Sequence, residues 1–361
     1  MNHSTDPAVI LAARRTPLGA FQGAFAGLTA PQLGACAIRA ALADSGLAPG
    51  DVDEVIMGMV LSAGIGQAPA RQAALAGGIP AATPATTVNK MCGSGMRAVM
   101  LAADQIVAGS ARTAVAGGLE SMTNAPYLLP KARAGYRMGH QEVLDHMFFD
   151  GLQSPWDGQL MGCFAEATAE KYNFGRKAQD DFAAESVRRA LAAVNDGHFE
   201  AEITPVTAKT RKGEVVVNKD ETPFTLDIAK IPTLKPAFKK DGTVTAASSS
   251  GISDGAAAVV LSRESFAASQ GRKPLARVVG YSSFAREPEW FTVAPVGAMQ
   301  KLLKQLNWQP KDVDLYEINE AFAAVPMAAP AKTSLRKCIP IKMREAAMLR
   351  AQNSRPVARS G

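Results

Sequence analysis

Hydrophobic positions along most of the chain fall in short apolar runs, which alternate with stretches of helical spacing and are separated by Gly and Pro turns. Two of the runs, Asp53–Leu61 and Ala114–Gly118, are typical of strands buried on both faces. Between them, the apolar residues that recur at helical spacing are Met96, Val99, Met100, Ala103, Ile106 and Val107. This alternation predicts an α/β architecture.

The strand that ends near Met91 is predicted to turn through Cys92-Gly-Ser-Gly into this helix. A cysteine at the first turn of a helix faces backbone N–H groups and the positive end of the helix dipole, which favour the thiolate. Gly93 and Gly95 permit a tight corner and leave room for a substrate beside the backbone. The alternative is a small, buried and inert core cysteine. The spacing alone does not decide between a nucleophile and a core residue.

An internal repeat organises the chain. Ala37–Val55 resembles Ala298–Tyr316, and a Pro, two Asp and a Val match at a constant offset of 261. Two similar helix-turn-strand units that arose by chance are the alternative. A true duplication places the counterpart of Cys92 near position 353.

The middle of the chain is more polar than the two repeated parts. Tyr127–Thr245 contains the long helical pattern Arg176–Val194, and its predicted apolar face consists of Phe182, Val187, Leu191 and Val194. Thr243–Leu261 then returns to the composition of a buried strand. We interpret the polar middle as an insertion.

Charge is concentrated at one end of the sequence. The net charge is +6, but residues 330–361 contain eight basic side chains and one acidic one, which leaves a net of −1 for residues 1–329. The body of the protein therefore gives no indication of a nucleic-acid partner.

Metal, disulfide and membrane signals are weak. The four cysteines lie far apart without a CxxC pair, and His140, His146 and His198 are not spaced with another ligand, so we expect free thiols and no metal site. The sequence has no apolar run of membrane-spanning length and does not start like a signal peptide. We expect a cytoplasmic protein with no membrane contact.

The segment Asn89–Ala98, NKMCGSGMRA, resembles the nucleophile motif of the thiolase family. The resemblance extends over residues 8–329. Its other motifs are Arg15-Thr16-Pro17, Gly66–Leu75, Ala116–Met122, Met161-Gly162 with the following AEATAEKY, Ser248–Ala258 and Asn319–Phe322. It implies two similar βαβ-rich halves in stacked α-β-α-β-α layers, with the C-terminal half incomplete. We expect a first half from residues 1–122 with 243–274, an inserted loop region at 123–242, a partial second half at 275–329 and an altered basic tail at 330–361.

The resemblance implies acyl transfer between CoA thioesters, as part of fatty acid metabolism. Cys92 would form an acyl-enzyme in the thiolysis of a 3-ketoacyl-CoA or in the condensation of two acetyl-CoA molecules. Asn319 would hold a water at an oxyanion position. Met161, Ser250, Gly251 and Phe322 would line the path of the pantetheine arm, although Leu160 stands before Met161 where many relatives have His. Judged without the family, Asn319 and Phe322 are better explained as turn-closing and core-packing residues.

The resemblance also implies CoA as a substrate, no permanently bound cofactor, and assembly into homodimers or tetramers. The family continues after Ala324 with a Gly-His-Pro segment and a Cys-x-Gly-Gly-Gly motif, and Ser334–Gly361 contains neither. No histidine follows His198, and Pro340, Ile341 and Lys342 replace the glycines expected after Cys338. We interpret the tail as a different reading frame or a foreign junction that begins after Met327. The alternative function is an impaired remnant that at most binds CoA or a partner subunit; a cysteine hydrolase is disfavoured.

Overall fold

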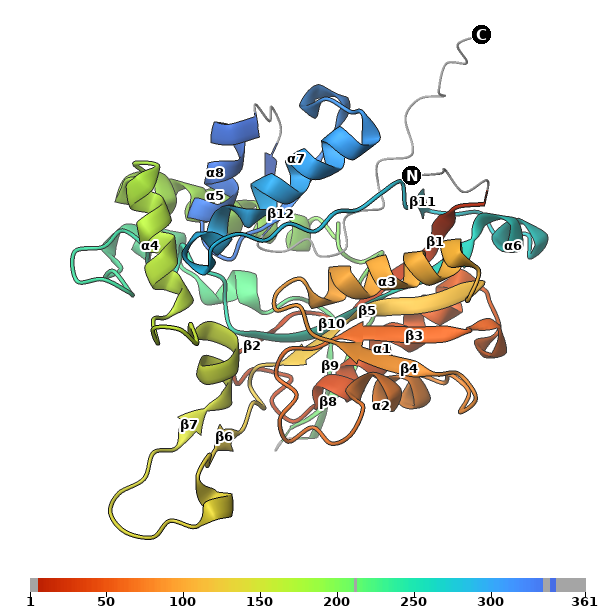
Figure 1. Ribbon diagram of the computed structural model, residues 1–361, viewed down its shortest axis with the longest axis horizontal. Coiled ribbons are helices and arrows are strands. Elements are labelled where there is room, and N and C mark those ends of the chain that lie inside the picture. The colour runs from red at the N-terminus through yellow and green to blue at the C-terminus, as the bar shows by residue number, and fades with distance from the viewer. Residues whose placement is uncertain (1–5, 211–212, 334–337, 342–361) are drawn as a thin grey trace.

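The computed structural model describes residues 6–210, 213–333 and 338–341, and a seven-stranded mixed sheet lies at the centre of the fold (Figure 1). Its strand order is β11-β1-β10-β5-β3-β4, with β2 also paired to β10. The strands of this sheet are β1 (Ala8–Arg15), β2 (Gly19–Ala20), β3 (Glu54–Gly58), β4 (Ala85–Val88), β5 (Thr113–Ser121), β10 (Ser253–Arg263) and β11 (Ala276–Arg277). β3 runs parallel to β4 and β5, whereas β10 runs antiparallel to β1 and β5.

Helices cover both faces of this sheet, with α1 and α2 on one side and α3 on the other (Figure 1). The helices are α1 (Ala30–Ser45), α2 (Pro69–Ala76), α3 (Ser94–Ala108), α4 (Met161–Lys171), α5 (Arg176–Asn195), α6 (Glu264–Ser269), α7 (Ala294–Leu306) and α8 (Ala324–Thr333). On β3, Val55 and Met57 pack in the core cluster that contains α1, whereas Ile56 packs with α3. Burial on both faces explains why β3 reads as an unbroken apolar run.

Two predicted strands have other ends in the structure than in the prediction. β3 stops at Gly58 and not at Leu61, because the Val60 and Leu61 N–H groups donate to the Glu120 carboxylate. β5 reaches from Thr113 to Ser121, further than predicted at both ends, because its whole length pairs with β10.

The predicted helix after Cys92 is confirmed as α3, and of the apolar residues that recur at helical spacing Ala103 and Ile106 are buried. Ala98, Ala102, Ala103 and Ile106 are the apolar residues that are buried, whereas Met96 and Val107 are 58% and 49% exposed. Small residues face the sheet because α3 lies very close to it.

The repeat found in the sequence is a structural repeat. α1, the 3-10 helix Pro49–Asp51 and β3 follow each other as do α7, the 3-10 helix Pro310–Asp312 and β12 (Tyr316–Asn319). Both helices end on a left-handed residue, Gly46 in one copy and Asn307 in the other, again 261 positions apart.

The two copies continue to correspond further along the chain. β4 pairs with β3 in parallel after α2, and β13 (Cys338–Ile341) pairs with β12 in parallel after α8. The predicted counterpart of Cys92 near position 353 lies outside the described residues. So does most of the predicted basic tail.

The polar middle of the chain contains α4, α5 and two hairpins. The hairpin strands are β6 (Tyr127–Leu128), β7 (Leu144–Asp145), β8 (Val206–Thr210) and β9 (Gly213–Val217). α5 confirms the long helical pattern, but its buried face is centred on Ala183, Val187 and Ala190, and Phe182 and Leu191 lie half-buried beside it. In the described part of the chain, no helix is long and apolar enough to cross a membrane.

A buried ion-pair cluster attaches this middle region to the sheet. Arg15, 2% exposed at the end of β1, donates to both oxygens of the buried Asp220 at 2.6 and 3.0 Å, and to Glu202 at 2.8 Å. The Asp220 carboxylate also accepts from the Leu18 N–H, and the Arg15 guanidinium lies over the Phe199 ring. The positive charge of a guanidinium buried in this way would be costly to the folded protein if the two carboxylates did not compensate it.

Replacing Asp220→Asn should lower the free energy of unfolding by about 3 kcal/mol, because it removes one of the two charges that compensate buried Arg15. Urea unfolding followed by circular dichroism measures the change. Asp44→Asn is the control, since Arg14 of the same strand pairs with Asp44 of α1 at a partly exposed site, and this pair should contribute at most about 1 kcal/mol. Equal effects of the two substitutions would contradict this account of the cluster.

Candidate active site

The corner between β4 and α3 is built from local hydrogen bonds. Met91 takes a left-handed conformation with φ of 49°, and its N–H donates to the Asn89 side-chain oxygen at 2.9 Å. The Ser94 hydroxyl accepts from the Lys90 N–H at 2.8 Å and donates to the Met91 carbonyl at 2.6 Å. These bonds hold a conformation that is unusual for a residue with a Cβ.

Cys92 lies in this corner, immediately before the N-cap Gly93 of α3, and its side chain is exposed. The alternative of a buried core cysteine is therefore wrong. Gly93 already belongs to the helix through its carbonyl, which accepts from the Arg97 N–H at 2.9 Å. An exposed thiol at the N-terminus of a helix of 15 residues is placed where the thiolate is favoured.

Glycines allow the start of α3 to approach the sheet. A Cβ at Gly58 would overlap the Ser94 backbone and lie 2.6 Å from the Gly95 nitrogen, and a Cβ at Gly118 would lie 3.4 Å from the Gly95 Cα. The position of Cys92 is thus set by backbone contact between α3, β3 and β5.

The other predicted catalytic residue, Asn319, is exposed at the end of β12. The segment that follows is hydrogen-bonded to the Ser248–Ser250 turn. The Ser250 N–H donates to the Ala321 carbonyl at 2.9 Å, and the Ala323 N–H donates to the Ser248 carbonyl at 2.8 Å. Two motifs about 70 residues apart in the sequence therefore form one surface.

The predicted pantetheine-path residues lie around this surface. Phe322 is 7% exposed and packs edge-on against Phe238, with ring centroids 5.9 Å apart, and Met161 packs into the same apolar cluster. Ser250 and Gly251 are exposed beside it. Phe322 therefore joins this surface to the apolar cluster around Phe238.

Sequence analysis missed Glu166, although it lies in the quoted AEATAEKY motif. This buried side chain of α4 accepts from the Val244 N–H at 2.8 Å, from the Thr243 N–H at 2.9 Å and from the Thr243 hydroxyl at 3.1 Å. It fixes the segment that leads to the Ser248–Ser250 turn. It is also the reason why the predicted strand over Thr243–Leu261 begins only at Ser253: the first residues bond to Glu166 and to one another.

Cys92 precedes α3, and Asn319 ends β12. In Figure 1, α3 lies between the seven-stranded sheet and the part of the chain that carries α7, β12 and α8. The Cys92 corner has a hollow of about 460 Å³ beside it, lined by residues that include Met59, Val88 and Asn89.

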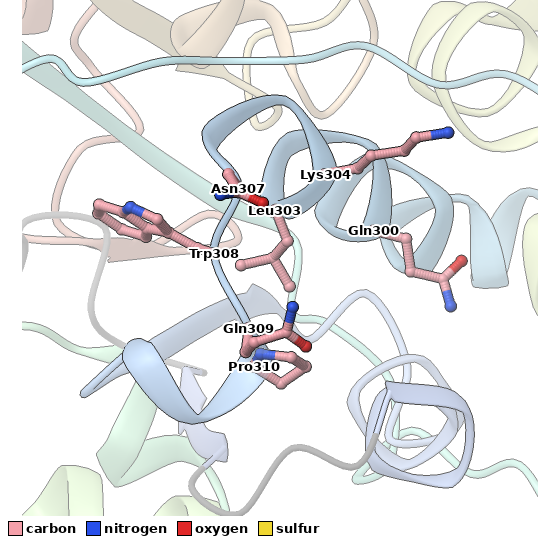
Figure 2. A pocket seen from close by; sticks show the side chains of 7 residues that line it. All are labelled: Gln300, Leu303, Lys304, Asn307, Trp308, Gln309 and Pro310. Carbon is pink, nitrogen blue, oxygen red and sulfur yellow. The ribbon is translucent and has the colours of Figure 1, made fainter.

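A second hollow, of about 320 Å³, lies at the C-terminal end of α7 (Figure 2). It is lined by Gln300, Leu303, Lys304, Asn307, Trp308, Gln309 and Pro310. None of the predicted site residues lines it.

Over the described ranges, no three His, Cys, Asp or Glu side chains are grouped to hold a metal ion. Of the histidines named above, His146 is buried, and its Nδ1 lies 2.5 Å from the Asp150 carboxylate.

The chain thus combines a glycine-lined corner that presents an exposed cysteine with a repeated α/β unit. The descriptions of the thiolase N-terminal and C-terminal domains match residues 8–265 and 272–338. The chain belongs to the thiolase family and is a thiolase-type enzyme.

Individual relatives agree with this assignment. The chain is 48% identical over 322 residues to the acetyl-CoA acetyltransferase of Pseudomonas aeruginosa, which covers 89% of this chain and 82% of the relative. It is 48% identical over 324 residues to the protein of the same name from Cupriavidus necator, with the same two shares covered. The crystal structure of the Bacillus anthracis acetyl-CoA acetyltransferase superposes with a TM-score of 0.89 at 40% identity, and covers 92% of this chain and 85% of that one. The predicted α/β thiolase fold is confirmed.

Replacing Gly58→Ala should destabilise the protein by about 1–3 kcal/mol and slow the alkylation of Cys92, because the added methyl group pushes the start of α3 off the sheet. Thermal unfolding and the rate of reaction with iodoacetamide measure both effects. A Cβ at Gly50 meets nothing within 4 Å, so Gly50→Ala is the matched control. Equal alkylation rates and equal unfolding temperatures of the two variants would contradict the claim that Gly58 allows α3 to approach the sheet.

Replacing Glu166→Gln should lower the free energy of unfolding by about 1–3 kcal/mol and accelerate amide hydrogen exchange at Thr243 and Val244. The reason is that an N–H₂ group replaces one of the two acceptor oxygens. Exchange followed by mass spectrometry locates the change. Glu170→Gln on the same helix is the control, since Glu170 is exposed and pairs with Lys239 at 3.6 Å. Slow exchange retained at both amides would show that Glu166 does not hold this segment.

Proposed function

We propose that this protein transfers acyl groups between CoA thioesters and that Cys92 carries the acyl group. The observation that carries the proposal is the exposed thiol immediately before α3, where the N-terminal N–H groups favour the thiolate. The names of the relatives, acetyl-CoA acetyltransferases, support acetyl groups as the cargo.

In thiolysis, the Cys92 thiolate attacks the ketone carbonyl of acetoacetyl-CoA. The bond between the second and third carbons of the acyl chain breaks, and its electron pair leaves on the acetyl-CoA carbon, which takes up a proton. The acetyl group on Cys92 then passes to the thiolate of a second CoA. Condensation of two acetyl-CoA molecules is the same sequence in reverse.

The remaining predicted residues support binding and charge stabilisation. We assign Asn319 to the oxyanion position, because its polar side chain is exposed at the end of β12. Met161, Ser250, Gly251 and Phe322 would form the wall along the pantetheine arm. CoA is the substrate and no permanently bound cofactor is needed for this chemistry.

We also propose the domain division given above, a cytoplasmic location, a place in fatty acid metabolism and assembly as a homo-oligomer. The impaired remnant stays as the alternative, because the 361-residue sequence has no histidine after His198.

Incubation with acetoacetyl-CoA should add the mass of one acetyl group to the protein, because the first step needs only the thiolate and a bound substrate. Intact-mass spectrometry detects the adduct, and peptide mapping should locate it on Cys92. Adding CoA should remove it and release acetyl-CoA.

Cys92→Ser and Cys163→Ser are the matched variants: the first should abolish the adduct and the second should leave it. An adduct that CoA does not remove would favour the impaired alternative. Absence of any adduct on folded protein would contradict the proposed function.

A further inference from the structure

The Val60 and Leu61 N–H groups, two and three residues after the end of β3, are held by a side chain. The Val60 N–H donates to one oxygen of the Glu120 carboxylate at 2.8 Å, and the Leu61 N–H donates to the other at 3.1 Å. Glu120 lies near the end of β5, and its Cα is paired with that of Gly255 on β10. One carboxylate thus accepts hydrogen bonds from two successive backbone N–H groups that are not paired in the sheet.

This segment runs directly beside the Cys92 corner. The Met59 N–H donates to the Val88 carbonyl at 3.0 Å, and the Asn89 side-chain amide reaches the Val60 carbonyl at 3.5 Å, a long hydrogen bond. The other end of the Asn89 amide accepts from the Met91 N–H at 2.9 Å. A continuous path of hydrogen bonds therefore leads from Glu120 through Val60 and Asn89 to the left-handed residue before Cys92.

Other titratable groups lie around Glu120 on the neighbouring elements. His146 holds the same segment further along, because its Nε2 accepts from the Ala63 N–H at 3.3 Å while its Nδ1 faces Asp150. The fully buried Asp254 accepts from the Ser121 hydroxyl and the Thr123 N–H, and repels Glu120.

Burial raises the pKa of the Glu120 carboxyl above its ordinary value of 4.5, the Val60 and Leu61 N–H groups lower it, and Asp254 raises it further. A carboxyl with a raised pKa contributes stability below about pH 4.5, and this contribution is lost as the pH rises through the folded-state value. The ionised form of this carboxyl is therefore less favourable in the folded protein than in the unfolded chain.

We propose that Glu120 is a positioning residue for Cys92: its ionised carboxylate fixes residues 60 and 61, and through Asn89 fixes the corner that presents the thiol to the helix N-terminus. The inference deepens the proposed function and rests on it. A carboxylate is required because both groups that contact it, the Val60 and Leu61 N–H groups, are hydrogen-bond donors. A glutamine would turn its own N–H₂ group toward one of the two backbone N–H groups.

The test is the pH dependence of Cys92 alkylation by iodoacetamide, measured by peptide mass spectrometry on the full chain. Glu120→Gln should lower the rate at pH 7 by about tenfold and move the midpoint of the rate-pH curve upward by about one unit, because a displaced corner loses thiolate stabilisation. Glu54→Gln is the matched control, since Glu54 begins β3 and accepts from the Thr86 hydroxyl at an exposed site. Its curve should coincide with that of the unchanged protein.

An unchanged curve for folded Glu120→Gln would overturn the inference. If that variant does not fold, Glu120→Asp takes its place, because it keeps both acceptor oxygens but withdraws them by one methylene; it should shift the curve in the same direction, and an unchanged curve would again overturn the inference. Alkylation uses no acyl-CoA. A missing acetyl adduct on the unchanged protein would therefore contradict the proposed function separately, through a different measurement.

Discussion

The close approach of α3 to β3 and β5 is the constraint on which the rest of the site depends. Gly58, Gly95 and Gly118 remove the side chains that would otherwise separate helix and sheet, so the first turn of α3 lies against the backbone of both strands. The face of α3 toward the sheet is alanine-rich, with Ala98, Ala102 and Ala103 buried before Ile106, whereas Met96 and Val107 are exposed. Because this contact leaves the backbone little freedom, it fixes where the start of α3 holds Cys92.

Buried carboxylates extend this rigid centre to the irregular segments. Asp220 compensates Arg15 and accepts from the Leu18 backbone, Glu166 holds Thr243 and Val244, and Glu120 holds Val60 and Leu61. Loops outside a ladder still need partners for their N–H groups, and one carboxylate can satisfy two of them with charge-assisted bonds. The walls of the site are thereby tied to α4, β1 and β5.

The duplicated halves use equivalent positions for different purposes. Gly58 ends β3 and Asn319 ends β12, at the same offset of 261 that relates Gly46 to Asn307. The first position is covered by the start of α3 and excludes a side chain, whereas the second presents an exposed amide. One repeated unit thus supports the Cys92 corner, and the other presents the exposed Asn319 side chain.

The sequence by itself determined the α/β class, the repeat, the helix after Cys92 and the thiolase motifs, because apolar periodicity and short glycine-rich signatures are local. It could not give the true end of β3, the buried face of α3 or the acceptor roles of Glu120 and Glu166. Those depend on partners 59 to 78 residues away in the chain, or on glycines of other strands that set how near a helix can lie. Only the tertiary structure brings such groups within hydrogen-bonding distance, and therefore only it decided which polar residues position the site.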